Sequence, residues 1–502
     1  MSEAVPLKTV ADPGLAGAGS PGEKGLKTGA LGFMSSVVIG VASTAPGYSL
    51  AASLGVVAAS VGFHAPAIMW VAFLPMFFIA ASYYAMNRVD PDCGTTFTWV
   101  TRGLGPWAGW LSGWALLVAD VLVMASLSQI AGKYSFLLFG ANSAANSVWW
   151  VTTVGVIWIV VMSWICYVGI EISARTQWFL LAAEVVVLAI FAVVALAKVY
   201  AGSFHDSVHP SLGWLNPFSL STGALSAGVL TAVFIYWGWD TAVAVNEETE
   251  DASRTPGKAA IVSTLLLLGI YVVDATAAQA VHGAGFLVKH QDDVLSALGS
   301  SVLPGGLDKL LIIAVLTSAS ASTQTTILPA TRATLSMAAH GAAPKQFAAI
   351  TPRYLTPGIS TIWMGAVSVV WYVILTAVSQ NILADSITAT GLAIAFYLGI
   401  TGVACIAYYR KALLRDLRTF LVAGLGSALG ALMLGYVFVR SCIDLANPSN
   451  STSGQSWLGL GVPLAIGILT LLLGAVLMLL QWRHSPAFFR RPTETADASV
   501  RV

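Results

Sequence analysis

Long apolar stretches separated by short polar segments run along most of the chain. An α-helix needs about 20 apolar residues to cross a bilayer, and twelve stretches reach that length. They lie at about 31–62, 65–87, 106–139, 148–168, 177–198, 222–245, 259–282, 308–331, 358–379, 381–409, 419–440 and 456–482. This pattern predicts an all-α membrane protein with twelve transmembrane helices.

Two of these stretches are interrupted at mid-depth. The stretch 222–245 contains Gly238 to Thr241, and the stretch 31–62 contains Ser43 to Gly47, with a proline. In hydrocarbon, freed backbone N–H and C=O groups need internal partners, so such a break indicates a polar site, although the first break could also be a tolerated proline kink. The breaks lie about 195 residues apart, at corresponding places in two halves of five spans. This pairing favours a transporter built from inverted repeats.

Composition supports a membrane protein and excludes several other classes. Hydrophobic residues make up 57% of the chain and charged residues 9%, too few charges to cover a soluble protein of 502 residues. A net charge of +1 gives no support for nucleic-acid binding. The four cysteines are isolated, so neither a metal site nor a disulfide framework is indicated. No Walker-type loop, HExxH or GxSxG motif occurs, so we expect neither an enzyme nor a cofactor.

The distribution of Lys and Arg predicts the orientation. With the N-terminus in the cytoplasm, all but five of the 24 Lys and Arg residues fall in tails and inner loops. The five on the outside are Lys133, Lys198, Lys289, Lys309 and Arg440. The positive-inside rule therefore places both termini in the cytoplasm of a multi-pass cell-membrane protein. Residues 1–27 and 484–502 have the composition of disordered cytoplasmic tails.

Four motifs in order carry a resemblance to a known family. They are NRVDPDCGTTFTWVTRGLGPWAGWLSGW after the second span, NPFSL at 216–220, FIYWGWD followed by EETEDASRTPGKA, and TRATLSMAAHGAAPKQFAAITPRYLTP at 331–357. Over residues 28–483 the chain resembles the amino acid/polyamine/organocation superfamily of secondary transporters. The resemblance implies a LeuT-like five-plus-five inverted repeat, with repeats at about 31–198 and 222–409 and two extra helices at about 419–482.

The resemblance also implies a substrate site between the two breaks, where amides of the first break hold a carboxylate and half-helix carbonyls hold an amino group. The residues assigned to the carboxylate side are Ser43, Thr44, Ala45 and Gly47, where the family usually has a Gly-Ser-Gly-like break. At the second break the candidates are Gly238 and Asp240, which either caps the second half-helix or lies in the cavity. Phe234 matches an aromatic gate of the family, and packing in an aromatic-rich span is the alternative.

Three further carboxylates lie within predicted spans: Asp120, Glu184 and Asp274. A carboxylate at the bilayer centre costs about 3 kcal/mol on insertion scales, so it normally faces a cavity or a partner. Several relatives in the superfamily place a lysine near Glu184, and we hypothesise that this carboxylate is a protonatable coupling group. A structural hydrogen bond is the alternative. Asp120 either attracts a cationic substrate or bonds a neighbouring helix, and Asp274 is the weakest candidate.

The predicted function is secondary active transport of an amino acid by alternating access, proton-coupled or by exchange. The expected partners are a small-molecule amino acid or amine, a proton and the lipid bilayer. A polyamine or organic-cation carrier is the main alternative, favoured if Asp120, Glu184 and Asp240 share one cavity. A sensor that binds an amino acid without transporting it is a further alternative.

Overall fold

A computed structural model describes residues 24–291, 293–497 and 499–502. This part of the chain is almost entirely α-helical, apart from a small antiparallel hairpin of β1 (Ser456–Trp457) and β2 (Leu460–Gly461). Ten helical segments are long and apolar enough to cross a membrane. The all-α, multi-pass class predicted from the hydrophobic pattern is therefore confirmed.

The predicted spans correspond to the following helices. The first half contains α1 (Phe33–Ser43), α2 (Pro46–Val61), α3 (Ala65–Val89), α4 (Thr96–Leu104), α5 (Pro106–Leu138), α6 (Asn142–Ala145), α7 (Val148–Val168) and α8 (Ile170–Tyr200). The second half contains α9 (Thr222–Ile235), α10 (Thr241–Ala244), α11 (Thr255–Lys289), α12 (Val294–Val302), α13 (Lys309–Ala339), α14 (Gly358–Val378) and α15 (Gln380–Tyr409). The chain continues through α16 (Leu417–Thr419), a π-helical segment (Phe420–Gly426), α17 (Ser427–Leu445), α18 (Val462–His484) and α19 (Pro486–Phe489).

The ten long segments and the twelve predicted spans differ for identifiable reasons. Residues Phe33–Val89 count as one segment although α1, α2 and α3 follow one another within it. The helix α9 has only 14 residues because the chain leaves helical geometry before Gly238. The first difference arises because only the short 3-10 turn Gly62–His64 separates α2 from α3, and the second because the break near Gly238 shortens α9.

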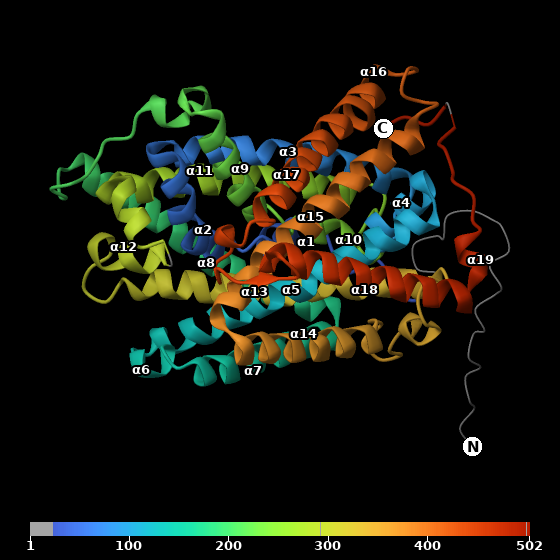
Figure 1. Cartoon of the computed structure of the whole chain (residues 1–502), viewed down its shortest axis with the longest axis horizontal. Helices are drawn as coiled ribbons and strands as arrows, with labels where there is room; N and C mark the ends of the chain where they lie inside the picture. The colour runs from blue at the N-terminus through green and yellow to red at the C-terminus, as the bar shows by residue number, and fades with distance from the viewer. Residues whose placement is uncertain (1–23, 292, 498) are drawn as a thin grey trace.

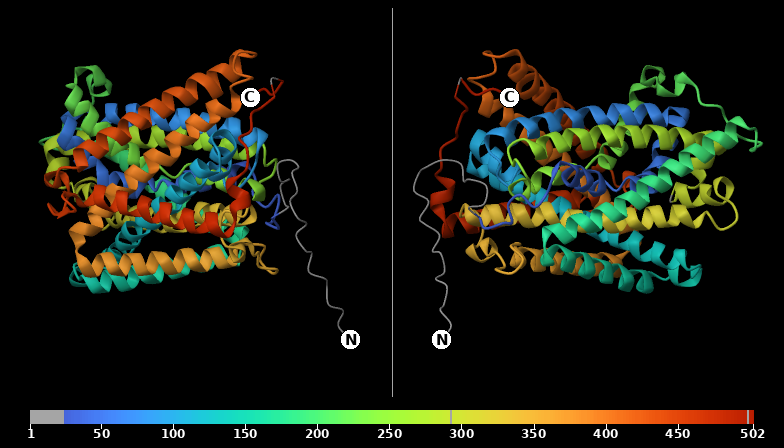
Figure 2. Two further views of the ribbon diagram at one scale, coloured as in Figure 1. Left: turned by 45° about the vertical axis from the view of Figure 1, so that its right-hand side comes forward. Right: turned by 180° about the vertical axis from the view of Figure 1, so that it is seen from behind.

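Figures 1 and 2 show how the helices are arranged. The helices α7 and α14 lie side by side along one edge of the bundle, and α16 and α17 extend from the other edge. The helices α5 and α13 pack against each other in the middle and are the most buried of the long segments. Their central position explains how polar side chains on α5, such as Asp120, are kept away from lipid.

One end of the bundle holds α4, α19 and both described ends of the chain, and the opposite end holds α12. At the α4 end, the Glu494 N–H donates to the Arg102 carbonyl at 2.7 Å. Phe488 on α19 is buried and stacks on Phe97 of α4 at 5.7 Å between ring centroids. Among the described residues of 484–502, Phe488 and Phe489 are buried and contact α4 and α5. Residues 1–23 of the predicted N-terminal tail lie outside the described residues.

Candidate functional site

Both predicted interruptions are breaks in the helical backbone. The first lies between α1 and α2, where Ala45 adopts a left-handed conformation with φ of 48°. Pro46 is the first residue of α2. A proline has no backbone N–H to donate, and it disfavours the right-handed helical conformation at the residue before it. The second lies between α9 and α10, where Gly238 has φ of 117°, a conformation that favours glycine.

The two breaks touch each other inside the bundle. The Ser43 Oγ lies 2.9 Å from the Thr241 Oγ1, which links the end of α1 to the start of α10. A Cβ placed on Gly238 would lie 2.7 Å from the carbonyl carbon and oxygen of Ser43. The second break can therefore approach the first only because residue 238 has no side chain.

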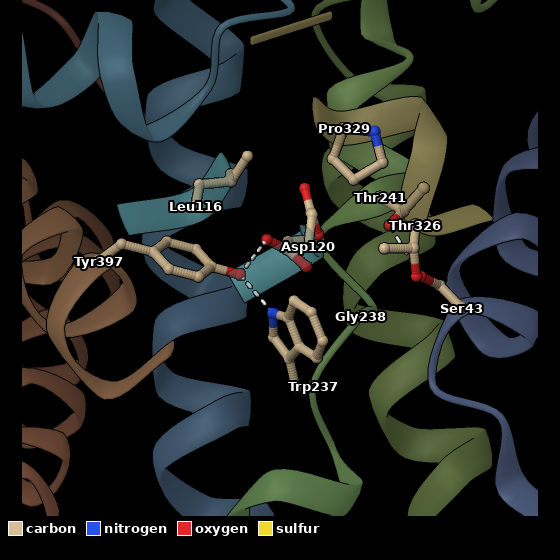
Figure 3. Close-up of a pocket in the computed structure, with 10 residues that line it drawn as sticks. Ser43, Leu116, Asp120, Trp237, Gly238, Thr241, Thr326, Pro329 and Tyr397 are labelled. Atoms are coloured by element: carbon tan, nitrogen blue, oxygen red, sulfur yellow. Dashed lines mark hydrogen bonds between the residues drawn. The ribbon is translucent and has the colours of Figure 1, made fainter. Parts of the chain in front are cut away.

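A small buried cavity opens where the breaks meet (Figure 3). It measures about 10 Å³, which is room for about one water molecule. The surrounding residues come from both breaks and from α5, α13 and α15, and are Ser43, Leu116, Asp120, Trp237, Gly238, Asp240, Thr241, Thr326, Pro329 and Tyr397. None of these described residues is Lys, Arg or His, so the cavity has two carboxylates and no basic side chain.

The two carboxylates of the cavity differ in their hydrogen bonds. The Tyr397 hydroxyl donates to the Asp240 Oδ2 at 2.8 Å and accepts the Trp237 Nε1–H at 2.5 Å. Asp240 makes no side-chain capping bond to α10, so the structure places it in the cavity rather than at a helix cap. Asp120 is 2% exposed, and its Oδ2 has no hydrogen-bond partner among the described residues. An unpaired buried carboxylate is costly, and a cationic group would satisfy it.

The predicted carboxylate side of the site is arranged differently from the expectation. Ser43 lines the cavity, but Thr44, Ala45 and Gly47 do not. The Gly47 N–H donates to the Glu184 Oε1 at 2.6 Å. The structure therefore brings Glu184 to the first break, where its carboxylate takes an amide of the break instead of leaving it exposed.

Two other candidates lie outside the cavity. Phe234 on α9 is half-buried, with its ring centroid 6.4 Å from that of Trp237, so it packs beside the cavity without lining it. Asp274 on α11 is buried, and its Oδ1 lacks a partner among the described residues. Asp274 and Glu184 do not share the cavity of Asp120 and Asp240.

Sequence reasoning missed several residues that complete the cavity. Tyr397 lies among apolar residues in the middle of α15, and no local pattern marks it. Thr326 and Pro329 lie on α13. The proline inside this helix could have indicated a polar site from the sequence, because it leaves a backbone carbonyl without its helical hydrogen bond. These residues reach the breaks only through packing between distant helices.

A cluster of ion pairs closes the α4 end of the bundle, and we call Lys24, Asp92, Glu247, Glu248 and Arg332 the α4-end cluster. The Lys24 Nζ lies 2.8 Å from the Asp92 Oδ2 and 2.5 Å from the Glu247 Oε1. The Arg332 Nε and Nη2 donate to the two oxygens of Glu248, each at 2.9 Å. Burial alone would raise the pKa of Asp92, but the Lys24 ammonium holds this pKa well below its usual range.

Two members of the α4-end cluster form a group of potential metal ligands with the neighbouring Cys93. The ligand atoms of Asp92, Cys93 and Glu247 all lie within 4.8 Å of one another. The Lys24 ammonium already bonds both carboxylates, so the positive charge that a cation would bring is supplied by the chain itself. We therefore interpret this group as an ion-pair closure.

Comparison with known proteins identifies the family. The sequence model of the family described as "Amino acid permease" matches residues 29–481. The chain belongs to the amino acid permease family. The resemblance found in the four motifs is thereby confirmed, and the chain is a multi-pass membrane transporter rather than an enzyme.

Relatives of this permease include proteins named for two kinds of solute. An uncharacterized transporter of Mycobacterium tuberculosis (strain H37Rv) is 26% identical over 345 residues, which cover 67% of this chain and 72% of that protein. The branched-chain amino acid permease BcaP of Bacillus subtilis is 25% identical over 368 residues, covering 70% and 76%. The low-affinity putrescine importer PlaP of Escherichia coli (strain K12) is 23% identical over 249 residues, covering 48% and 51%.

Proposed function

We propose that this permease is a secondary active transporter that carries a small amine-bearing solute, an amino acid or an amine, across the cell membrane. The observation that carries the proposal is the pair of carboxylates, Asp120 and Asp240, in a buried cavity between two broken helices. An ammonium group would pair with the Asp120 oxygen that has no hydrogen-bond partner among the described residues. The relatives named for branched-chain amino acids and for putrescine have solutes that share an ammonium group, which supports this chemistry.

The proposed architecture has twelve crossings and two inverted repeats, at about 31–198 and 222–409. The broken pairs α1/α2 and α9/α10 occupy corresponding positions in the two halves. Both described ends of the chain lie at the same end of the bundle, as an even number of crossings requires. These features support alternating access, in which the two breaks form a fixed site that opens to one side at a time.

Transport requires the cavity to enlarge. About 10 Å³ cannot hold an amine of several heavy atoms, so the helices around the cavity would have to separate for such a solute to bind. The α4-end cluster links four parts of the chain. These are Lys24 before α1, Asp92 between α3 and α4, Glu247 and Glu248 after α10, and Arg332 on α13. Rupture of these ion pairs is the proposed step that opens the cytoplasmic side.

Glu184 is the proposed proton-coupling residue. It is fully buried on α8, and its carboxylate holds the first turn of α2 through Gly47. A change in its protonation would alter the hold of α8 on one half of the first broken helix. The hydrogen bond from the Gly47 N–H to Glu184 would therefore link the proposed proton coupling to the position of α2.

The test is uptake by proteoliposomes containing the purified full-length chain. A pooled panel of labelled amino acids and amines is supplied with and without an inward proton gradient. We expect uptake of at least one ammonium-bearing solute, increased by the gradient. Binding of panel members without any flux would instead support the sensor, and the absence of both binding and flux would contradict the proposed function.

A further inference from the structure

The first turn of α2 has the geometry of a carboxylate-binding site that is already filled. A helix N-terminus presents unpaired amides and the positive end of the helix dipole, which together favour a carboxylate. Pro46 has no N–H, and the Gly47 N–H donates to Glu184 at 2.6 Å. The next amide, that of Tyr48, donates to the Ser318 Oγ at 3.1 Å. The chain's own side chains therefore take the amides of this turn.

Glu184 is built into this position. It lies on α8, is fully buried, and its Oε2 has no hydrogen-bond partner among the described residues. A second carboxylate brought to the same turn would find these amides already taken by Glu184 and Ser318. A buried carboxylate without such donors is left unsatisfied, which disfavours its binding. A carboxylate-bearing solute would have to displace Glu184 or bind without this helix terminus.

The cavity between the two breaks, which the α2 terminus does not line, is complementary to a cation. Asp120 and Asp240 line the cavity, and Asp120 has an unpartnered oxygen. Ser43 also lines the cavity and lies four residues before Gly47, so the cavity and the occupied helix terminus belong to the same break. None of the described residues around the cavity offers a basic side chain to an anion.

From this arrangement we infer that Glu184 takes the place of a substrate carboxylate and makes the permease selective for protonated amines that lack one. This inference rests on the proposed transport function and specifies the substrate class of the same site. Glu184 is then a specificity-determining residue, because it discriminates between an amino acid and the amine that differs from it by loss of the α-carboxylate.

The experiment compares matched pairs in proteoliposomes: putrescine with ornithine, and 3-methylbutylamine with leucine. The two members of each pair differ only in the carboxylate. For the unmodified chain we expect at least one amine to be taken up about tenfold or more faster than its amino acid, because the carboxylate of the amino acid would lack these hydrogen-bond donors. Faster or equal uptake of the amino acid in every pair would overturn the inference while leaving the transport function intact.

Two substitutions separate the presence of the side chain from its charge. Glu184→Ala frees the Gly47 N–H at the helix terminus, so the amino acid of each pair should gain relative to its amine by about tenfold or more. Glu184→Gln keeps an oxygen on the Gly47 N–H and should preserve the preference for the amine. Glu171→Ala is the control, because Glu171 lies on the same helix but is exposed and pairs with Lys27.

The outcomes of the variants are decisive in both directions. If Glu184→Ala retains the full preference of the unmodified chain, Glu184 is not the discriminating residue. If Glu184→Ala is not recovered folded, the matched pairs measured on the unmodified chain and on Glu184→Gln still decide the substrate class. Uptake of other panel solutes without uptake of any member of these pairs would overturn the inference, whereas the absence of binding and flux for the whole panel would contradict the transport function.

Discussion

At the scale of single residues, Gly238 controls the contact between the two breaks. A Cβ there would lie 2.7 Å from backbone atoms of Ser43, which cannot rotate away, and the φ of 117° is unfavourable for other residues. We expect Gly238→Ala to add about 3 kcal/mol of strain and to reduce uptake about tenfold or more. Uptake is measured in proteoliposomes at equal protein content.

The control for this substitution is Gly269→Ala on α11. Nothing lies within 4 Å of a Cβ at Gly269, so its uptake should remain within about twofold of the unmodified chain. An equal rate for Gly238→Ala and Gly269→Ala would show that the breaks do not need their close approach.

Glu184 gives a second prediction at this scale. Glutamine cannot bind or release a proton, but its amide oxygen can still accept the Gly47 N–H. We therefore expect Glu184→Gln to keep uptake driven by the solute gradient and to lose the increase caused by an inward proton gradient. Uptake is followed between pH 5 and 8, with Glu171→Gln as the control. An unchanged pH profile would remove Glu184 from the coupling mechanism.

At the scale of elements, the α4-end cluster makes a prediction about opening. Cys93 is fully buried, and its N–H donates to the Glu247 Oε1 at 3.0 Å. Lys24→Met would leave Asp92 and Glu247 as close like charges, so the loops should separate. In a chain with Cys166, Cys405 and Cys442 replaced by Ser, we expect maleimide labelling of Cys93 to accelerate about tenfold or more. Lys27→Met, at a more exposed pair, is the control.

Within this cluster, the Lys24–Asp92 ion pair should be insensitive to pH over the physiological range. Burial would lower the pKa of Lys24, but Asp92 and its neighbours raise it, so this stabilisation is complete below about pH 10 and is lost only above that. The pKa of Asp92 is lowered despite burial, so its stabilisation is present above about pH 4 and is lost only as the pH falls further. The rate of Cys93 labelling in the folded chain, divided by the rate in the unfolded chain, should therefore be the same at pH 6 and at pH 8.

The elements also show what the sequence can and cannot specify. The two breaks were predictable because Pro46 and Gly238 act on the backbone locally. The bond between Tyr397 and Asp240 joins residues 157 apart and depends on how α15 rotates against α10, for which no local pattern exists. Glu184 was recognisable as a buried carboxylate, but its occupation of the α2 terminus depends on the packing of α8. The sequence thus identified the breaks, whereas side-chain directions across helices required the structure.

At the scale of the whole molecule, the two ends of the described chain reinforce the same surface. The Arg102 Nε lies 2.7 Å from the Asp90 Oδ2, and its Nη1 lies 2.9 Å from the Glu494 Oε2. At the end of the chain, the Val502 N–H donates to the Thr419 Oγ1 at 3.2 Å. The C-terminal residues therefore cover the same end of the bundle that the α4-end cluster closes, and this end carries most of the Lys and Arg residues assigned to the cytoplasm.

This arrangement makes the orientation testable in whole cells. Ser203 is exposed in the segment between α8 and α9, and Gln346 is exposed between α13 and α14. With both termini in the cytoplasm, these positions face opposite sides of the membrane. In a chain whose four cysteines are replaced by Ser, an impermeant maleimide should label Ser203→Cys on intact cells and Gln346→Cys only after permeabilisation. The reverse pattern would invert the orientation, and labelling of both on intact cells would contradict the predicted number of crossings between them.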